Sequence, residues 1–418
     1  MQIKNNKGIM EDKTTFVPYG RQWIDEDDIQ AVVGVLRSDR LTQGPKIEEF
    51  ENALAEYCKA KYAVAVNSAT SALHIACIAA EVVSGDEVIT SSITFVASAN
   101  CAVYCNAKPV FADIDPKTYN IDPMEIEKKI NSHTRAIIPV HFAGQSCDME
   151  SIYKIIKKKE EEFNKKIFII EDACHALGSI YKNKKVGDCT FSDMTVMSFH
   201  PVKHITTGEG GAVLTNDETL YKKLKRLKSH GITFNPKEFV NNDLALQSLN
   251  SGGIKPLLNP WYYEQTDLGY NYRLTDIQCA LGLSQLKKLD IFRKRRREIV
   301  NKYNAAFRDA KFVHIPCEDD KCNSNFHLYV LLFDFEKIGI ERARLMLELK
   351  SKGIQTQVHY IPVYLQPFYQ KHFGTKWGDC QNAEHYYQRC LSMPLFPAMA
   401  DQDVERVVEE INNLVRSE

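Results

Sequence analysis

Short strand-like runs alternate with helical patterns through the first two-thirds of the chain, and this alternation constrains the fold most. Ile167–Ile170 is continuously apolar, which is typical of a strand covered on both faces of a sheet, and Glu87–Ser91 and Met194–Ser198 are further strand-like runs. Between them, Met149–Phe163 has a helical period. Further strands are expected at Tyr62–Val66, Pro109–Ile114, Ala136–His141 and Ala212–Leu214, and further helices at Ile47–Cys58, Ser71–Ala80 and Val96–Tyr104. The pattern predicts an α/β fold with a mostly parallel central sheet.

The sequence changes character after Gly231. Residues 233–260 lack periodicity and are rich in Asn, Ser, Gly and Pro, which predicts a long loop. Beyond it, we expect long helices over 276–307, with the basic run Arg293–Arg297 facing solvent, and a smaller α+β domain. The elements expected in that domain are strands over 326–333 and 355–360 and helices over 342–352 and 402–415.

These patterns give an expected domain organisation. Residues 1–14 form an N-terminal extension, and residues 15–260 form a large domain that carries the loop 233–260. Residues 261–418 form linker helices and the small domain.

Composition excludes several classes of function. Lys plus Arg number 53 and Asp plus Glu number 54, so the chain lacks the excess of positive charge that nonspecific nucleic-acid binding requires. It contains neither a long apolar run nor the hydrophobic region of a signal peptide, so we expect no membrane association and a cytoplasmic location. The 12 cysteines include no Cys-x-x-Cys pair, which predicts buried thiols, such as Cys77, Cys101 and Cys279, and no metal site.

An acid and a lysine follow two of the expected strands. Asp172 ends the buried strand at Ile167–Ile170, where open α/β sheets bind ligands, although it could also cap a following helix. Lys203 lies after Met194–Ser198 among apolar and small residues, and a glycine-rich turn follows. A partly desolvated lysine has a lowered pKa and can form a Schiff base.

A third element completes the pattern. Asn67–Ser71 lies where a strand gives way to a helix, so its hydroxyls and free N–H groups suit either a helix cap or a bound phosphate. Pyridoxal 5′-phosphate (PLP) needs a lysine for its aldehyde, a carboxylate beside its pyridine nitrogen and a phosphate site. The three elements together therefore predict PLP binding.

Six motifs in order resemble those of the DegT-like nucleotide-sugar aminotransferases, which are fold-type I PLP enzymes. They are Leu41–Pro45 (LTQGP), Asn67–Leu73 (NSATSAL), Asp172–His175 (DACH), Ser198–Lys203 (SFHPVK), Gly208–Gly211 (GEGG) and Gly269–Asp276 (GYNYRLTD). The resemblance runs from about Pro18 to the C-terminus. It implies a large domain with a mostly parallel sheet and a smaller C-terminal α+β domain.

The resemblance also implies residue roles. Lys203 would be the Schiff-base lysine and the proton carrier, and Asp172 would pair with the pyridine nitrogen. The remaining cofactor contacts would be Ser68, Ala69 and Ser198 at the phosphate, Phe95 stacked on the ring, His175 near the ring oxygen or the phosphate, and Asn271 at the phosphate of a neighbouring subunit. A homodimer with shared active sites follows from the last of these.

The same resemblance suggests substrates. Glutamate is the family's usual amino donor, and the Pro260–Glu264 segment is similar to members that aminate C4 of a UDP-linked 4-keto-6-deoxy-N-acetylhexosamine on the way to pseudaminic acid. Arg273, Tyr263, His327 and His359 are candidate substrate contacts. Each also has a structural interpretation, which for Arg273 is an ion pair with Asp276.

Other functions remain open at this point. The chain could aminate another sugar nucleotide, such as a dTDP-sugar, or aminate C3, or bind PLP as a regulatory protein without turnover. Relatives with a histidine in place of the lysine dehydrate sugars, and Lys203 argues against that reaction. A cysteine desulfurase would need a nucleophilic cysteine on a loop, and Cys317 and Cys322 lie in no motif of that kind.

Overall fold

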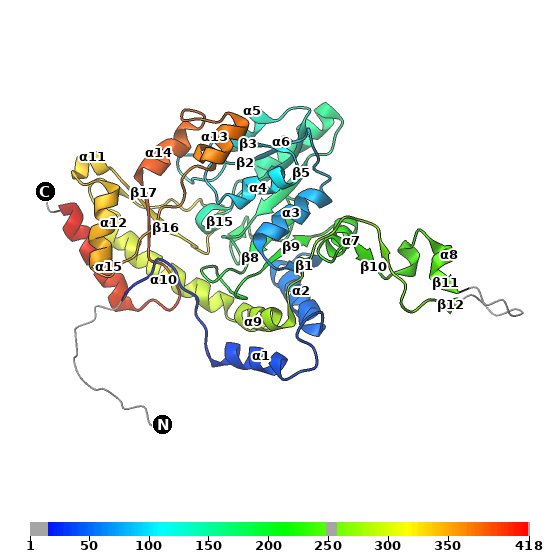
Figure 1. Ribbon diagram of the computed structural model, residues 1–418. Coiled ribbons are helices and arrows are strands. Elements are labelled where there is room, and N and C mark those ends of the chain that lie inside the picture. Colours follow the sequence, from blue (N-terminus) through cyan, green and yellow to red (C-terminus); the bar gives the residue numbers. More distant parts are fainter. Residues whose placement is uncertain (1–15, 248–256, 417–418) are drawn as a thin grey trace, which may run out of the picture.

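A seven-stranded sheet forms the centre of the molecule in the computed structural model, which describes residues 16–247 and 257–416 (Figure 1). Its strand order is β1-β9-β8-β5-β4-β2-β3. The strands are β1 Tyr62–Val66, β9 Gly211–Thr215, β8 Met194–Ser198, β5 Phe168–Asp172, β4 Thr134–Ile138, β2 Glu87–Ser91 and β3 Lys108–Ala112. Only β9 runs against its neighbours in this sheet, so the expected mostly parallel α/β architecture is confirmed.

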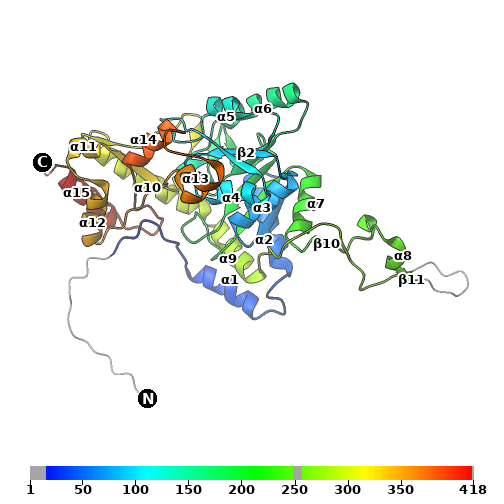
Figure 2. The same cartoon turned by 45° about the horizontal axis from the view of Figure 1, so that its top comes forward.

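Helices cover both faces of this sheet because successive side chains of each strand point to opposite sides. On one face, the core is built with α3 Ala69–Ala79, α4 Ala97–Tyr104 and α7 Glu218–Leu227. On the other face, it is built with α2 Pro45–Cys58, α5 Pro123–Lys129, α6 Met149–Phe163 and α9 Asp276–Leu286. Figure 2 shows these helices around the sheet, with α1 Glu26–Leu36 against α9. Cys77, Cys101 and Cys279 are buried, as expected.

A smaller antiparallel sheet lies in the C-terminal part of the chain. It has the order β14-β16-β17, with bounds Val313–His314, Tyr329–Phe333 and Cys390–Met393. Its core includes side chains of α10 Leu289–Phe307, α12 Arg342–Ser351 and α15 Asp401–Arg416. Shorter helices follow the same part of the chain at α11 Phe335–Ile338, α13 Pro367–Phe373 and α14 Gln381–Arg389. Across the described ranges, no helix has the length and apolar character needed to cross a bilayer.

The expected strand over 355–360 is wrong. Gln357 and Ser392 exchange backbone hydrogen bonds of 3.2 and 2.7 Å, but this is an isolated bridge rather than a strand. The chain leaves the small sheet after this contact, because His359 and Tyr360 line the cavity described below. The β-branched and aromatic residues that predict a strand are also common in extended segments that line a cavity without pairing in a sheet.

Arg296 contradicts the expectation that the basic run on α10 faces solvent. Its side chain is fully buried, and its Nη1 atom donates to the carbonyl oxygens of Phe326, His327 and Leu395 at 3.0–3.3 Å. Its neighbour Arg297 pairs instead with Glu318. The run therefore ties α10 to the loops of the small domain.

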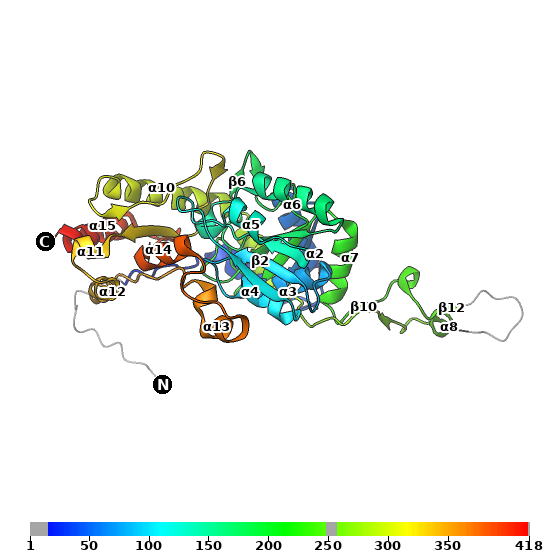
Figure 3. The ribbon, with the colours of Figure 1, turned by 90° about the horizontal axis from the view of Figure 1, so that it is seen from above.

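Residues 232–247 and 257–265 form an arm that extends from the large domain, away from the small domain (Figure 3). Its short elements are β10 Ile232–Thr233, a 3₁₀ turn at Pro236–Glu238, α8 Asn242–Ala245, β11 Leu246–Gln247, β12 Leu257–Leu258 and β13 Glu264–Gln265. The sequence predicted a long loop without regular structure here, and the described part differs, because it contains several elements of two to four residues each. The predicted extension over 1–14 lies outside the described residues, and the division at residue 260 stays a prediction.

Candidate functional site

A cavity of about 480 Å³ lies at the carboxyl ends of the parallel strands, where sheets of this kind bind ligands. The large domain contributes Ser68 and Phe95, which follow β1 and β2, Asp172 and Ser198, which end β5 and β8, and Lys203. The small domain contributes His359 and Tyr360, and the N-terminal segment contributes Tyr19. The cavity is therefore built from segments far apart in the sequence.

Asp172 is the last residue of β5, and its carboxylate is held from two sides. Ser98 Oγ donates to Oδ2 at 2.6 Å, and the Cys174 backbone N–H donates to Oδ1 at 3.2 Å. The alternative that Asp172 caps a helix is wrong, because residues 174–178 form turns. An oriented, buried carboxylate at this strand end fits a protonated heterocyclic nitrogen.

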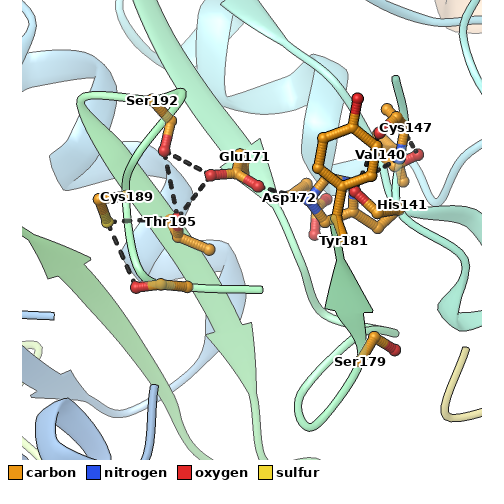
Figure 4. A network of polar contacts seen from close by, with 12 residues as sticks. Val140, His141, Cys147, Glu171, Asp172, Ser179, Tyr181, Cys189, Ser192 and Thr195 are labelled. Atoms are coloured by element: carbon orange, nitrogen blue, oxygen red, sulfur yellow. Dashed lines mark hydrogen bonds and ion pairs between the residues drawn. The ribbon is translucent and has the colours of Figure 1, made fainter. Parts of the chain in front are cut away.

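A buried network fixes the strand end behind Asp172 (Figure 4). Glu171 accepts hydrogen bonds from Ser192 and from Thr195, the latter at 3.0 Å, and lies 2.6 Å from His141 Nε2. Because the Cys147 N–H donates to His141 Nδ1, the ring proton lies on Nε2 and points at Glu171. Burial alone would raise the pKa of Glu171, but these partners lower it overall.

The Glu171 network lies on the side of β5 away from the cavity. Through His141 after β4 and Thr195 in β8, it joins β5 to the segments on both sides. The His141 backbone N–H also donates to the Asp172 carbonyl at 3.1 Å. The network therefore limits the positions that Asp172 can adopt.

Lys203 lies in the loop after β8 and lines the same cavity as Asp172. Its backbone N–H donates to the His200 carbonyl at 2.8 Å, which closes a turn. Burial lowers the pKa of Lys203, and nearby Cys174 and Asp172 oppose this shift only in part. The amine is thus more often neutral than that of a solvated lysine, as a Schiff-base nucleophile requires.

Ser68 and Ala69 begin α3 at one end of the cavity. Ser68 Oγ accepts from the Ser71 N–H at 3.1 Å, so the helix-cap interpretation is confirmed. Both residues also line the cavity, where the helix N-terminus favours an anion such as a phosphate. A Cβ atom on Gly211 would lie 2.6–2.7 Å from the Ser68 carbonyl and the Ala69 nitrogen, so only glycine permits this close approach.

Imidazole and aromatic groups form the rest of the wall. His175 lines the cavity, and its Nε2 atom lies 3.2 Å from the Tyr360 hydroxyl. His327 lies outside the lining but packs on His175, with ring centroids 4.2 Å apart. His359 lines the cavity, and its Nδ1 atom lies 2.8 Å from Ser392 Oγ. Phe95 is 57% exposed beside the opening.

Besides His327, three further predicted site residues lie outside the cavity of their own chain. They are Asn271, Arg273 and Tyr263. Arg273 Nη1 donates to Ser229 Oγ at 3.2 Å. The alternative ion pair between Arg273 and Asp276 is wrong, because the Asp276 carboxylate accepts backbone N–H groups of the Leu41–Pro45 motif and its neighbour Lys46.

The sequence did not indicate Tyr19, Ser98 or Tyr360 as site residues. Ser98 lies four residues after Thr94 at the start of α4, and both hydroxyls are buried. In the sequence, the only local signal for Ser98 was its position, with Thr94, at the junction of an expected strand and an expected helix. The sequence around Tyr19 and Tyr360 contains no such signal, because both residues reach the cavity from segments distant in the chain.

Four buried histidines make stability depend on pH. Burial is the largest cause that lowers the pKa values of His175, His204, His327 and His359, the last to about 3. Below pH 6.5 the unfolded chain therefore binds protons that the native chain does not, so stability falls as pH falls. We expect a loss of about 1 kcal/mol per histidine between pH 6.5 and 5.5, measured by urea unfolding.

The variant His327→Gln checks the cause, because it removes one of the four buried imidazoles and should reduce the loss by about 1 kcal/mol. A free energy of unfolding that stays constant from pH 7.5 to 5.5 would contradict the burial of neutral imidazoles.

Comparisons with known proteins agree with this site. The model of the DegT/DnrJ/EryC1/StrS aminotransferase family matches residues 22–412. Spore coat polysaccharide biosynthesis protein SpsC of Bacillus subtilis is 41% identical over 409 residues, which cover 98% of this chain and 99% of that protein. The UDP-4-amino-4,6-dideoxy-N-acetyl-beta-L-altrosamine transaminase of Campylobacter jejuni is 39% identical over 403 residues, which cover 96% and 97%.

A solved structure gives the same result. Helicobacter pylori PseC, an aminotransferase involved in the biosynthesis of pseudoaminic acid, superposes with a TM-score of 0.85 at 35% identity, covering 97% of this chain and 100% of that one. The family match spans nearly the whole chain, and the cavity holds the lysine and carboxylate that PLP requires. The chain therefore belongs to the DegT/DnrJ/EryC1/StrS aminotransferase family and is a PLP-dependent sugar aminotransferase.

Proposed function

We propose that this aminotransferase moves the amino group of glutamate to C4 of a UDP-linked 4-keto-6-deoxy-N-acetylhexosamine, in a pathway of the pseudaminic acid type. The observation that carries the proposal is the placement of Lys203, Asp172 and the N-terminus of α3 around one cavity. The narrower choice of sugar is supported by the two relatives whose names refer to a UDP-sugar transaminase and to pseudoaminic acid. We place the reaction in the cytoplasm.

Different residues of the cavity would bind different parts of the cofactor. PLP, when bound, supplies an aldehyde carbon and an electron-accepting ring. Lys203 would bind the aldehyde, and the Asp172 carboxylate would keep the pyridine nitrogen protonated. Ser68, Ala69 and Ser198 would bind the phosphate, where the dipole of α3 adds to their hydrogen bonds.

Lys203 would also move the protons. Its amine, when free, would accept the proton from the carbon of the amino substrate and would donate it again, while PLP would supply the electron-accepting ring that makes this proton acidic. The lowered pKa of Lys203 suits this role, because a general base works best when it is largely neutral near the working pH. Glutamate and the ketosugar would use the same lysine in turn, so we expect ping-pong kinetics.

The remaining side chains would orient the substrates. Phe95 would stack on the cofactor ring, and His175 would lie near the ring oxygen or the phosphate. His359 would contact a substrate, because it lines the cavity, whereas His327 would act through the His175 ring on which it packs.

We propose a homodimer in which Asn271 reaches the cofactor phosphate of the neighbouring subunit, with Arg273 and Tyr263 close to the same neighbouring site. Asn271 is exposed and outside the cavity of its own chain. The arm carries solvent-exposed apolar side chains that a second copy would cover, including Phe234, Val240 and Trp261, which are 72%, 76% and 69% exposed.

Subunit mixing tests the shared site. Lys203→Ala and Asn271→Ala proteins, each weakly active alone, should recover activity when they are unfolded and refolded together. Half of the random dimers would then be hybrids with one intact site, so about a quarter of wild-type activity is expected. Mixtures no more active than their components would show that Asn271 serves its own chain or no site.

The substrate proposal is tested with a panel of UDP- and dTDP-linked 3-keto and 4-keto sugars, each with glutamate as donor. The amino product should appear with the UDP-linked 4-keto-6-deoxy-N-acetylhexosamine, and NMR should place nitrogen on C4. Amination at C3, or a strict preference for dTDP-sugars, would overturn the choice of sugar while leaving the family unchanged. PLP binding without reaction toward any amino donor would instead indicate a regulatory protein.

A further inference from the structure

Tyr360 reaches the cavity from the small domain, and its hydroxyl contacts the large domain. The phenol oxygen lies 3.2 Å from His175 Nε2, and the two rings are nearly parallel, with centroids 6.2 Å apart and an interplanar angle of 18°. The phenol ring also lies near Phe142 and Phe95, with centroid distances of 6.3 and 6.4 Å. Its position is therefore fixed by packing on the large domain.

Both partners of this hydrogen bond are neutral. Burial, together with the charge of Asp172, raises the pKa of Tyr360, so the hydroxyl keeps its proton. Burial, together with the charge of Lys203, lowers the pKa of His175 well below its usual value, so the imidazole carries a single proton. Two neutral groups at this distance form an ordinary hydrogen bond that does not depend on pH near neutrality.

The phenol supplies the polar contact that orients this imidazole. In the described part of the chain, the buried Nδ1 atom of His175 has no hydrogen-bond partner. The other close neighbour is the ring of His327, which contributes packing without a directional bond. Loss of the Tyr360 hydroxyl would thus leave both ring nitrogens of His175 without a partner.

We propose that Tyr360 is a positioning residue of the active site, which holds the His175 ring toward the cofactor and links this contact to docking of the small domain. The inference rests on the proposed role of His175 at the cofactor. Asp172, three residues earlier, is held by Ser98 and by the Glu171 network, whereas His175 depends on a residue 185 positions away. Cofactor affinity should therefore respond to one hydroxyl in the small domain.

The test measures PLP affinity with Tyr360→Phe, by titrating the PLP-free protein and following tryptophan fluorescence. Phenylalanine keeps the ring contacts, so the fold should survive, and we expect about tenfold weaker binding because a buried acceptor loses its partner. Tyr369→Phe is the matched control. The Tyr369 hydroxyl also joins the C-terminal part of the chain to the large domain, because it donates to Asn100 Oδ1 on α4 at 2.5 Å. Tyr369 lies outside the cavity, so PLP binding should not change.

A double-mutant cycle separates positioning from general destabilisation. In a His175→Ala background, Tyr360→Phe should weaken PLP binding no further, because its partner is already gone. Wild-type affinity in Tyr360→Phe, or an equal loss with and without His175, would overturn the inference. Failure of the wild-type protein to bind PLP would instead overturn the proposed function, so the two failures are distinguishable.

Discussion

Lys203→Arg should lower transamination by at least about 10³-fold and should abolish the absorbance of lysine-bound PLP. Arginine keeps the positive charge of the residue, but its guanidinium does not lose a proton in the working pH range and forms no Schiff base with the aldehyde. The measurement is the rate of 2-oxoglutarate release from glutamate, together with the visible spectrum of the purified protein.

The control for the lysine variant is Lys222→Arg on α7, where Lys222 pairs with Glu218 on the surface. That protein should keep full activity and its PLP spectrum. Retained turnover in Lys203→Arg, above a few per cent of the wild-type rate, would show that another group carries the protons.

Asp172→Asn should lower the rate by about 10²- to 10³-fold while PLP stays bound. The amide oxygen can still accept from Ser98, and only the 3.2 Å hydrogen bond from the Cys174 N–H is lost, so the strand end should keep its position. The amide no longer carries the negative charge that keeps the pyridine nitrogen protonated, and the ring therefore withdraws electrons less strongly. Both half-reactions should slow together, which single-turnover measurements with glutamate and with the ketosugar would detect.

Asp122→Asn provides the comparison for this substitution. Asp122 caps α5 through the Met124 N–H, and asparagine caps helices equally well, so activity should not change. A wild-type rate in Asp172→Asn would contradict the role of this carboxylate. A rate loss that tracks a lowered thermal unfolding midpoint would assign it to structure instead.

The central elements of the site were predictable because each depends on local sequence. The buried strand before Asp172 and the glycine-rich turn after Lys203 are short patterns with a direct physical meaning, and the parallel sheet brings their ends together. The sheet itself followed from the alternation of apolar strands and amphipathic helices. Both inferences needed only the periodicity of the chain.

Contacts between distant segments could not be predicted in the same way. Ser98 and Asp172 are 74 residues apart, and Tyr360 and His175 are 185 apart, so no local pattern joins them. The burial of Arg296, by contrast, has a local signal in the sequence. Arg296 lies four residues after Phe292 and three before Ile299, which places it on the apolar face of α10. This helical spacing, rather than the charge of the run, determines that its side chain is buried.

The covalent attachment of PLP to Lys203 is the claim on which the mechanism depends, and borohydride reduction followed by peptide mass mapping tests it most directly. Reduction should fix the pyridoxyl group permanently on the peptide that contains Lys203, and prior incubation with excess glutamate should prevent the labelling. A pyridoxyl group found on a different lysine, or no label on a protein that has bound PLP, would contradict the account.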